Sequence, residues 1–103
     1  MKNTLAILCL LFLSAATVAD NFQISYRQGA SLSYIAYSPV RLFDSDNRQV
    51  FSGSTDGLGR IIINYKTGTY RLEIDYRNNT YKKMVTIDQN RAFKPVSVSV
   101  ADM

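Results

Sequence analysis

The chain has 103 residues, of which 47% are apolar and 12% aromatic, with 12 Lys and Arg against 8 Asp and Glu. This length is typical of one domain. Histidine is absent and cysteine occurs once, which excludes Ser–His and Cys–His nucleophile pairs, His-ligated zinc and imidazole acid–base catalysis. The formal net charge of +4 is too small to indicate a nucleic-acid partner.

Residues 1–19 have the pattern of a secretory signal peptide. A short basic start (residues 1–3) precedes an apolar run (residues 5–13), and Thr17 and Ala19 then supply the small side chains that a cleavage after Ala19 requires. The apolar stretch is shorter than the roughly 20 residues that span a bilayer, which argues against a transmembrane anchor. We therefore expect residues 20–103 to form one exported domain, periplasmic or secreted, with no transmembrane segment.

The single cysteine, Cys9, falls inside this leader. A lipid-attachment cysteine would need a small residue before it, and Leu8 occupies that position. Once the leader is removed, the domain has no cysteine, so its core must stabilise it without disulfides.

The rest of the chain predicts strands throughout, because apolar and polar residues alternate with period two. The alternation is clearest in Thr69–Arg77, where the even-numbered residues are apolar or tyrosine. The expected strands are Phe22–Tyr26, Ser38–Asp44, Arg48–Ser54, Arg60–Tyr65, Thr69–Arg77, Thr80–Asp88 and a last strand that carries Val96, Val98 and Val100.

Turn-forming residues separate these strands. We expect a loop at Arg27–Ser33 and turns at Asp44–Asn47, Asp56–Gly59, Lys66–Gly68, Asn78-Asn79 and Gln89–Arg91. The consecutive isoleucines 61–63 predict a central strand with two buried faces, and Pro95 indicates that the last strand lies at a sheet edge. Six or seven short strands separated by turns predict an all-β, antiparallel Greek-key sandwich of the transthyretin-like or immunoglobulin-like kind.

Two motifs make this prediction more specific. Thr55-Asp56-Gly57-Leu58-Gly59 precedes one strand, and Gly68-Thr69-Tyr70 opens the next. Their order and spacing resemble those of carboxypeptidase regulatory-like domains, which have the transthyretin-like (prealbumin-like) sandwich fold. In these turns Asp56 can bind the backbone through its carboxylate, and Gly59 can adopt a positive φ. The ring of Tyr70 is expected to pack inward while its hydroxyl finds a backbone partner.

The resemblance implies a non-catalytic role, because such domains are typically accessory or adhesive modules. The transthyretin-like hydrolases of the urate pathway need His residues and a C-terminal Tyr-Arg-Gly-Ser. This chain has no His and ends Val-Ala-Asp-Met, so we do not expect that activity.

Several residue groups suggest other sites, each with a simpler structural explanation. Asp44, Asp46 and Asp56, with Asn47, would provide oxygen ligands for calcium if their turns met, but turns also select these residues for backbone reasons. The acids Glu73 and Asp75 have no predicted cleft in which to act as a glycosidase pair. Arg71 with Glu73, and Lys82 with Lys83, fit a solvated sheet face. Asn78-Asn79-Thr80 has the form of a glycosylation sequon, but it also fits a hairpin turn.

The chain has seven tyrosines, and two of them are candidate binding residues. Tyr34 and Tyr37 lie in or beside the expected loop, where their rings would be able to stack on a sugar or a peptide. The favoured hypothesis is a non-catalytic module that binds a protein through an exposed sheet edge or end loops, with no metal and no cofactor. The alternatives are a carbohydrate-binding module that uses Tyr34 and Tyr37, and a small hydrolase built on carboxylates.

Overall fold

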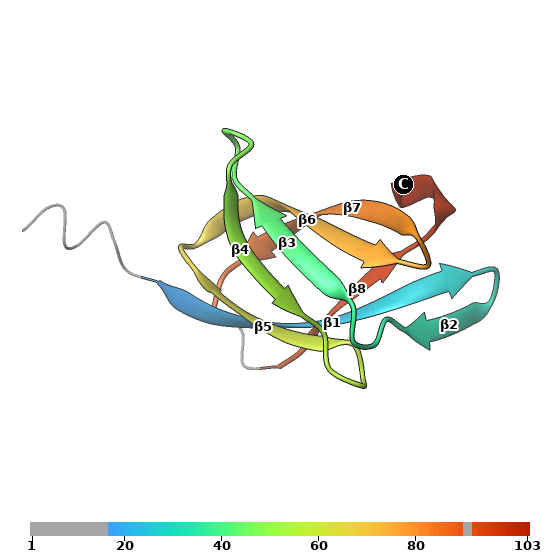
Figure 1. Cartoon of the computed structure of the whole chain (residues 1–103). Coiled ribbons are helices and arrows are strands. Elements are labelled where there is room, and N and C mark those ends of the chain that lie inside the picture. The colour runs from blue at the N-terminus through green and yellow to red at the C-terminus, as the bar shows by residue number, and fades with distance from the viewer. Residues whose placement is uncertain (1–16, 90–91) are drawn as a thin grey trace, which may run out of the picture.

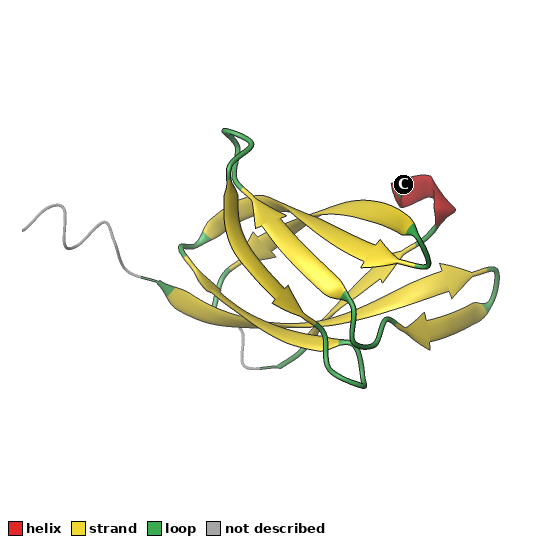
Figure 2. Ribbon diagram, in the orientation of Figure 1, coloured by secondary structure: helices red, strands yellow, loops and turns green. Residues whose placement is uncertain are grey.

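The computed structural model describes residues 17–89 and 92–103, which form eight strands and one short 3-10 helix. In chain order the elements are β1 (Val18–Gln28), β2 (Ser31–Tyr34), β3 (Pro39–Phe43), β4 (Gln49–Ser54), β5 (Arg60–Tyr65), β6 (Gly68–Tyr76), β7 (Asn79–Ile87), β8 (Lys94–Val98) and η1 (Val100–Asp102). The strands form two facing sheets (Figures 1 and 2). The predicted all-β sandwich is confirmed. Most of the expected signal peptide, residues 1–16, lies outside the described residues.

The first sheet is built around the long strand β1. Its first half pairs with β5, from Val18 opposite Tyr65 to Gln23 opposite Arg60, and its second half pairs with β2, both antiparallel. β8 pairs with β1 in parallel, so this sheet is not wholly antiparallel as expected. The two strands are far apart in sequence and no hairpin joins them, so nothing in the connection imposes an antiparallel direction.

The second sheet has the order β4-β3-β6-β7, and every pair in it is antiparallel. A two-residue turn, Arg77-Asn78, joins β6 to β7, and both residues have positive φ (50° and 63°). Such turns match the right-handed twist of the strands. The expectation of an Asn78-Asn79 loop was therefore wrong by one residue, because Asn79 already pairs with Tyr76.

The core fills the space between the sheets with side chains that alternate along each strand. The buried apolar residues are Phe22, Ile24, Ile35, Val40, Leu42, Ile61, Ile63, Tyr70, Leu72, Ile74, Tyr81, Val85, Ile87, Val96 and Val98. In β5, Ile61 and Ile63 are buried but Ile62 is 52% exposed. The central position predicted for this strand was wrong. β5 pairs with β1 alone among the described strands, and its outer face is open to solvent.

Three local expectations also differ from the structure. The loop expected at Arg27–Ser33 is a hairpin, because β1 continues to Gln28 and turns at Gly29 (φ 60°) into β2. Val100 is 63% exposed in η1 instead of continuing the last strand. The turn expected at Gln89–Arg91 falls partly on residues 90–91, outside the described residues. Pro95 does lie in an edge strand, since β8 pairs only with β1 in the described part of the chain.

Candidate functional site

The Thr55–Gly59 motif forms the turn between β4 and β5, and the carboxylate of Asp56 organises it. Its Oδ1 accepts hydrogen bonds from the backbone N–H groups of Leu58 (2.9 Å) and Arg60 (2.8 Å). Its Oδ2 accepts one from Nε of Arg60 at 2.9 Å. These contacts, led by the backbone N–H of Arg60, hold the pKa of Asp56 below its ordinary value. The Asp56 carboxylate therefore closes the turn, and the guanidinium of Arg60 neutralises its charge.

Thr55 ties this turn to the segment between β2 and β3. Its buried hydroxyl donates to the carbonyl of Ile35 at 2.6 Å and accepts from the backbone N–H of Ser38 at 3.0 Å. The N–H of Thr55 donates to the carbonyl of Ser38 at 3.0 Å. The residues between Ile35 and Ser38 are thus held against the β4–β5 turn from both sides.

Tyr37 lies inside this clamped segment and projects toward solvent. It is 79% exposed and has a φ of 51°, a left-handed conformation that is unfavourable for a bulky residue. Its hydroxyl lies over Gly57, where an added Cβ would be only 2.6 Å from the Tyr37 oxygen. Gly57 therefore leaves room for the ring, and the backbone holds an aromatic side chain at the surface in a strained conformation.

An open groove of about 640 Å³ begins at Tyr37 and follows the side of the sandwich where β4 and β5 are the outer strands. Its lining residues come from the segment between β2 and β3, from β4, from β5, from the β4–β5 turn and from the segment before β8. They are Tyr37, Phe51, Gly53, Ser54, Thr55, Asp56, Arg60, Ile61, Ile62 and Phe93. We call this the Tyr37 groove. Of its exposed apolar residues, Ile62 is 52% and Phe93 39% exposed.

The two charged residues of the Tyr37 groove, Arg60 and Asp56, are bonded to each other. The guanidinium of Arg60 also lies over the ring of Phe93, 5.4 Å from its centroid, in a cation–π contact. The groove consequently presents aromatic, aliphatic and small polar groups, and its one ion pair is satisfied internally. Such a lining suits an apolar side chain or ring of a ligand.

Only one of the two candidate tyrosines lines this groove. Tyr34 is 52% exposed on β2, opposite Ser25 of β1, and it does not contribute to the groove lining. The structure therefore does not bring Tyr34 and Tyr37 together into one groove. It places Tyr37 beside Phe51, Ile62 and Phe93 instead.

The acidic residues considered for calcium do not converge. Asp44 and Asp46 lie in the β3–β4 turn and pair with Arg48, whereas Asp56 lies in the turn at the other end of β4. Within residues 17–89 and 92–103, no group of three potential metal-ligating side chains is found. Each of these carboxylates instead serves its own turn.

The second motif, Gly68 and Tyr70, lies away from the groove and is structural. The Tyr70 hydroxyl donates to the carbonyl of Lys66 at 2.8 Å, closing the β5–β6 turn, and Gly68 has a φ of 152°. Burial raises the pKa of Tyr70, which keeps the hydroxyl protonated as a donor.

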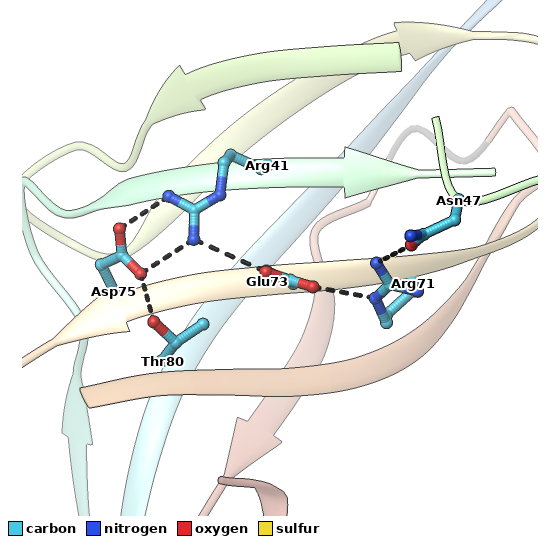
Figure 3. A network of polar contacts seen from close by, with 6 residues as sticks. All are labelled: Arg41, Asn47, Arg71, Glu73, Asp75 and Thr80. Carbon is cyan, nitrogen blue, oxygen red and sulfur yellow. Dashed lines mark hydrogen bonds and ion pairs between the residues drawn. The ribbon is translucent and has the colours of Figure 1, made fainter. Parts of the chain in front are cut away.

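The outer face of the second sheet carries an ion-pair network (Figure 3). Both guanidinium nitrogens of Arg41 donate to the carboxylate of Asp75, at 2.7 and 3.0 Å, and one lies 3.6 Å from Glu73. Glu73 also accepts from Arg71 at 2.9 Å, and Thr80 donates to Asp75 at 2.8 Å. The acids Glu73 and Asp75 are thus joined by arginine on a sheet surface and do not flank a cleft, as a glycosidase pair would.

Comparison with known proteins yields a likeness in fold. No family model matches the chain, and no curated protein matches it. Among solved structures, the Bacillus anthracis TIE protein aligns over 80% of this chain with a TM-score of 0.58 and 17% sequence identity. The aligned region is 17% of that protein's length. The described residues contain no helix that is long and apolar enough to cross a membrane.

Sequence reasoning missed most of the groove. The sequence places Phe51 and Ile62 in strands and Phe93 outside every predicted strand and turn, and it gives none of the three a binding role, because each reads as an ordinary apolar residue. One signal was available for Ile62. In a run of three isoleucines in an antiparallel strand, the middle side chain points away from the other two.

Proposed function

We propose that this chain is an exported, non-catalytic binding module that holds a protein partner in the Tyr37 groove. The observation that carries the proposal is the groove itself, in which an exposed aromatic residue is fixed in a strained backbone conformation beside Phe51, Ile62 and Phe93. Backbone strain of this kind costs about 1–3 kcal/mol and is often found at ligand-contacting positions. The leader pattern of residues 1–19 supports export, to the periplasm or outside the cell.

A protein ligand is favoured over a carbohydrate because of the walls of the groove. Two outer strands, β4 and β5, border it, and sheet edges of this kind are a common docking element for peptides. A sugar-binding platform built from Tyr34 and Tyr37 would need both rings on one surface, and only Tyr37 lines the groove. The resemblance to carboxypeptidase regulatory-like domains, which are accessory modules, agrees with a binding role.

The test is affinity capture with the exported protein and two matched variants. Tyr37→Ser removes the exposed ring from the groove, and Tyr34→Ser removes a second exposed ring that does not line it. Extract from the compartment into which the protein is exported is passed over each. We expect one stoichiometric protein to be retained by the wild type and by Tyr34→Ser, and its retention to fall about 30-fold or more with Tyr37→Ser, as for a hot-spot aromatic residue.

Two outcomes would contradict this proposal. Retention on polysaccharide beads alone, weakened by both substitutions, would favour the carbohydrate alternative. Capture that is unaffected by Tyr37→Ser would place the binding surface elsewhere. A third variant, Gly57→Ala, provides an independent check, because its Cβ forces the Tyr37 ring to move without removing it.

A further inference from the structure

β5 forms one wall of the Tyr37 groove, and its backbone is set up for pairing on the side away from β1. The N–H of Ile24 in β1 donates to the carbonyl of Gly59 at 2.8 Å, immediately before β5 begins. From this bond and the regular register of β5 on β1, alternate residues of β5 direct their N–H and C=O groups toward β1. The groups of Ile62 and Asn64 therefore face the opposite edge of β5, with which no described strand pairs. We call this the free edge of β5.

Arg60 lies at the start of the same edge, and both of its backbone hydrogen-bonding groups already have partners. Its N–H donates to the Asp56 carboxylate and its carbonyl accepts from the Asp56 N–H at 2.9 Å. The edge that remains for pairing runs from Ile62 to the end of β5. This part of the edge offers the N–H and C=O groups of Ile62 and Asn64, which are two donors and two acceptors. An extended chain that pairs with β5 as a further strand would bind all four.

The other sheet edges carry features that oppose strand addition. On β7, Lys94 donates to the carbonyl of Thr86 at 2.7 Å, and Lys83 pairs with Asp102 of η1 at 3.6 Å. On β8, Pro95 lacks an N–H. β4 has a register shift opposite Leu42 and Phe43, and β2 is only four residues long. Within the described residues, β5 is the outer strand that combines a six-residue length with an unbroken register and no proline or lysine.

The side chains around this edge indicate what kind of segment it accepts. Ile62 and Phe93 present apolar surface on the outer side of the first sheet, and Phe51 presents it on the inner side. The charge of Arg60 is neutralised by Asp56. Beyond the far end of β5, Lys66 is exposed and has no carboxylate partner among the described residues. Its ammonium lies 6.0 Å from the centroid of the Tyr65 ring.

We propose that an extended segment of the partner protein adds to β5 as a further strand of the first sheet. Its backbone bonds to Ile62 and Asn64, its apolar side chains alternate between Phe51 on one side and Ile62 with Phe93 on the other, and a carboxylate beside the apolar stretch meets Lys66. This inference rests on the proposed function for the existence of a protein partner, and it specifies how that partner is held.

The first experiment locates the contact in the full chain. A photo-crosslinking amino acid replaces Ile62 in one variant and Met84 in another, and both variants are exported in the producing cell. Met84 is the matched control because it is 63% exposed on β7, in the other sheet. We expect crosslinks from position 62 and none from position 84, with the linked residue in an apolar stretch of the partner that has an acidic flank.

The second experiment tests pairing directly with that crosslinked stretch as a synthetic peptide. We expect the peptide to slow amide hydrogen exchange at Ile62 and Asn64 at least tenfold. We also expect loss of this protection when alternate peptide nitrogens are methylated and can no longer donate. Ile62→Pro should abolish binding, since it removes a donor that faces the free edge and leaves the β1 ladder intact, whereas Met84→Pro should not.

The results separate this inference from the proposed function. Binding that depends on Tyr37 but survives Ile62→Pro and peptide methylation would overturn strand addition and leave the groove as the binding site. Crosslinking of position 62 to a second copy of the chain would contradict the partner segment and would show that β5 mediates self-association. Absence of binding altogether would overturn both proposals.

Discussion

The carboxylate of Asp20, at the start of β1, accepts a hydrogen bond from Nζ of Lys94 in β8 at 2.7 Å. Asp20 is 0% exposed, and it also accepts from the backbone N–H of Asp88, just beyond β7, at 3.0 Å. Burial alone would raise the pKa of Asp20, but the bonds from Lys94 and Asp88 lower it overall. One buried charge therefore connects the first strand, the last strand and the end of β7.

Asp20→Asn should destabilise the fold by about 2–3 kcal/mol, because it leaves the half-buried ammonium of Lys94 with one carboxylate fewer. Asp88 also contacts Lys94, at 2.8 Å, but is more than half exposed. Asp88→Asn is therefore the control and should cost less than about 1 kcal/mol. Urea denaturation of both variants measures the difference, and equal losses would show that the burial of Asp20 has no special importance.

Acid should weaken the protein through carboxylates such as Asp75. The hydrogen bond from Arg41, ahead of that from Thr80, holds the pKa of Asp75 below its ordinary value. A carboxyl group with a lowered folded-state pKa binds fewer protons than in the unfolded chain, so its contribution is complete above its unfolded pKa of about 4. That contribution is lost as the pH falls through the folded-state pKa.

The variant Arg41→Gln should make the free energy of unfolding less dependent on pH below about pH 4, since the pKa of Asp75 then rises toward its ordinary value. Lys66→Gln removes a cation that pairs with no carboxylate in the described residues and should leave the slope unchanged. Denaturation curves at several pH values between neutrality and pH 3 provide the measurement. An identical slope in wild type and Arg41→Gln would contradict this assignment.

The fold was predictable because period-two alternation decides which side chains enter the core. In β6, Tyr70, Leu72 and Ile74 are buried and the residues between them face out, as the sequence indicated. The role of Asp56 was predictable for a different reason, since turn chemistry is local, whereas the hydroxyl of Thr55 bonds to Ile35 and Ser38, which are distant in sequence. Asp56 binds backbone groups within four residues of itself.

The groove could not be predicted, because it depends on which strands become outer strands. The sequence of β5 is apolar enough for a central position, but β5 pairs with β1 alone among the described strands, and Ile62 lies on its outer face, 52% exposed. The parallel pairing of β8 with β1 is equally non-local. Asp20 was expected only as the first residue after cleavage, whereas its role depends on Lys94, which is far away in sequence and next to it in space.

Gly59, in the β4–β5 turn, should lose more stability on substitution by alanine than Gly29, in the β1–β2 turn. Its φ is 73°, and a Cβ there would lie 2.3 Å from the carbonyl oxygen of Ile24. That oxygen already accepts from the N–H of Ile35, so it cannot move freely. Gly59→Ala should therefore cost more than the roughly 1 kcal/mol of a positive φ alone.

Gly29→Ala is the matched control for this prediction. Gly29 has a φ of 60° in the β1–β2 turn, but nothing lies within 4 Å of an added Cβ. It should lose only about 1 kcal/mol, by thermal or urea denaturation. If both variants lost the same stability, the contact with Ile24 would not matter.

The proposed cleavage after Ala19 would leave the buried carboxylate of Asp20 in the exported domain. Val18 and Ala19 pair with Tyr65 and Asn64 at the end of β5. Cleavage after Ala19 would remove these two residue pairs from the β1–β5 ladder and would keep the Asp20 carboxylate. Cleavage one residue later would remove Asp20 and its bond to Lys94. We expect the exported protein to begin at Asp20, as measured by intact mass and N-terminal sequencing.

Ala19→Leu should block processing, because position −1 needs a small residue, whereas Val18→Leu should not. An exported product that begins at Asn21, with wild-type stability, would contradict both the cleavage site and the importance of Asp20.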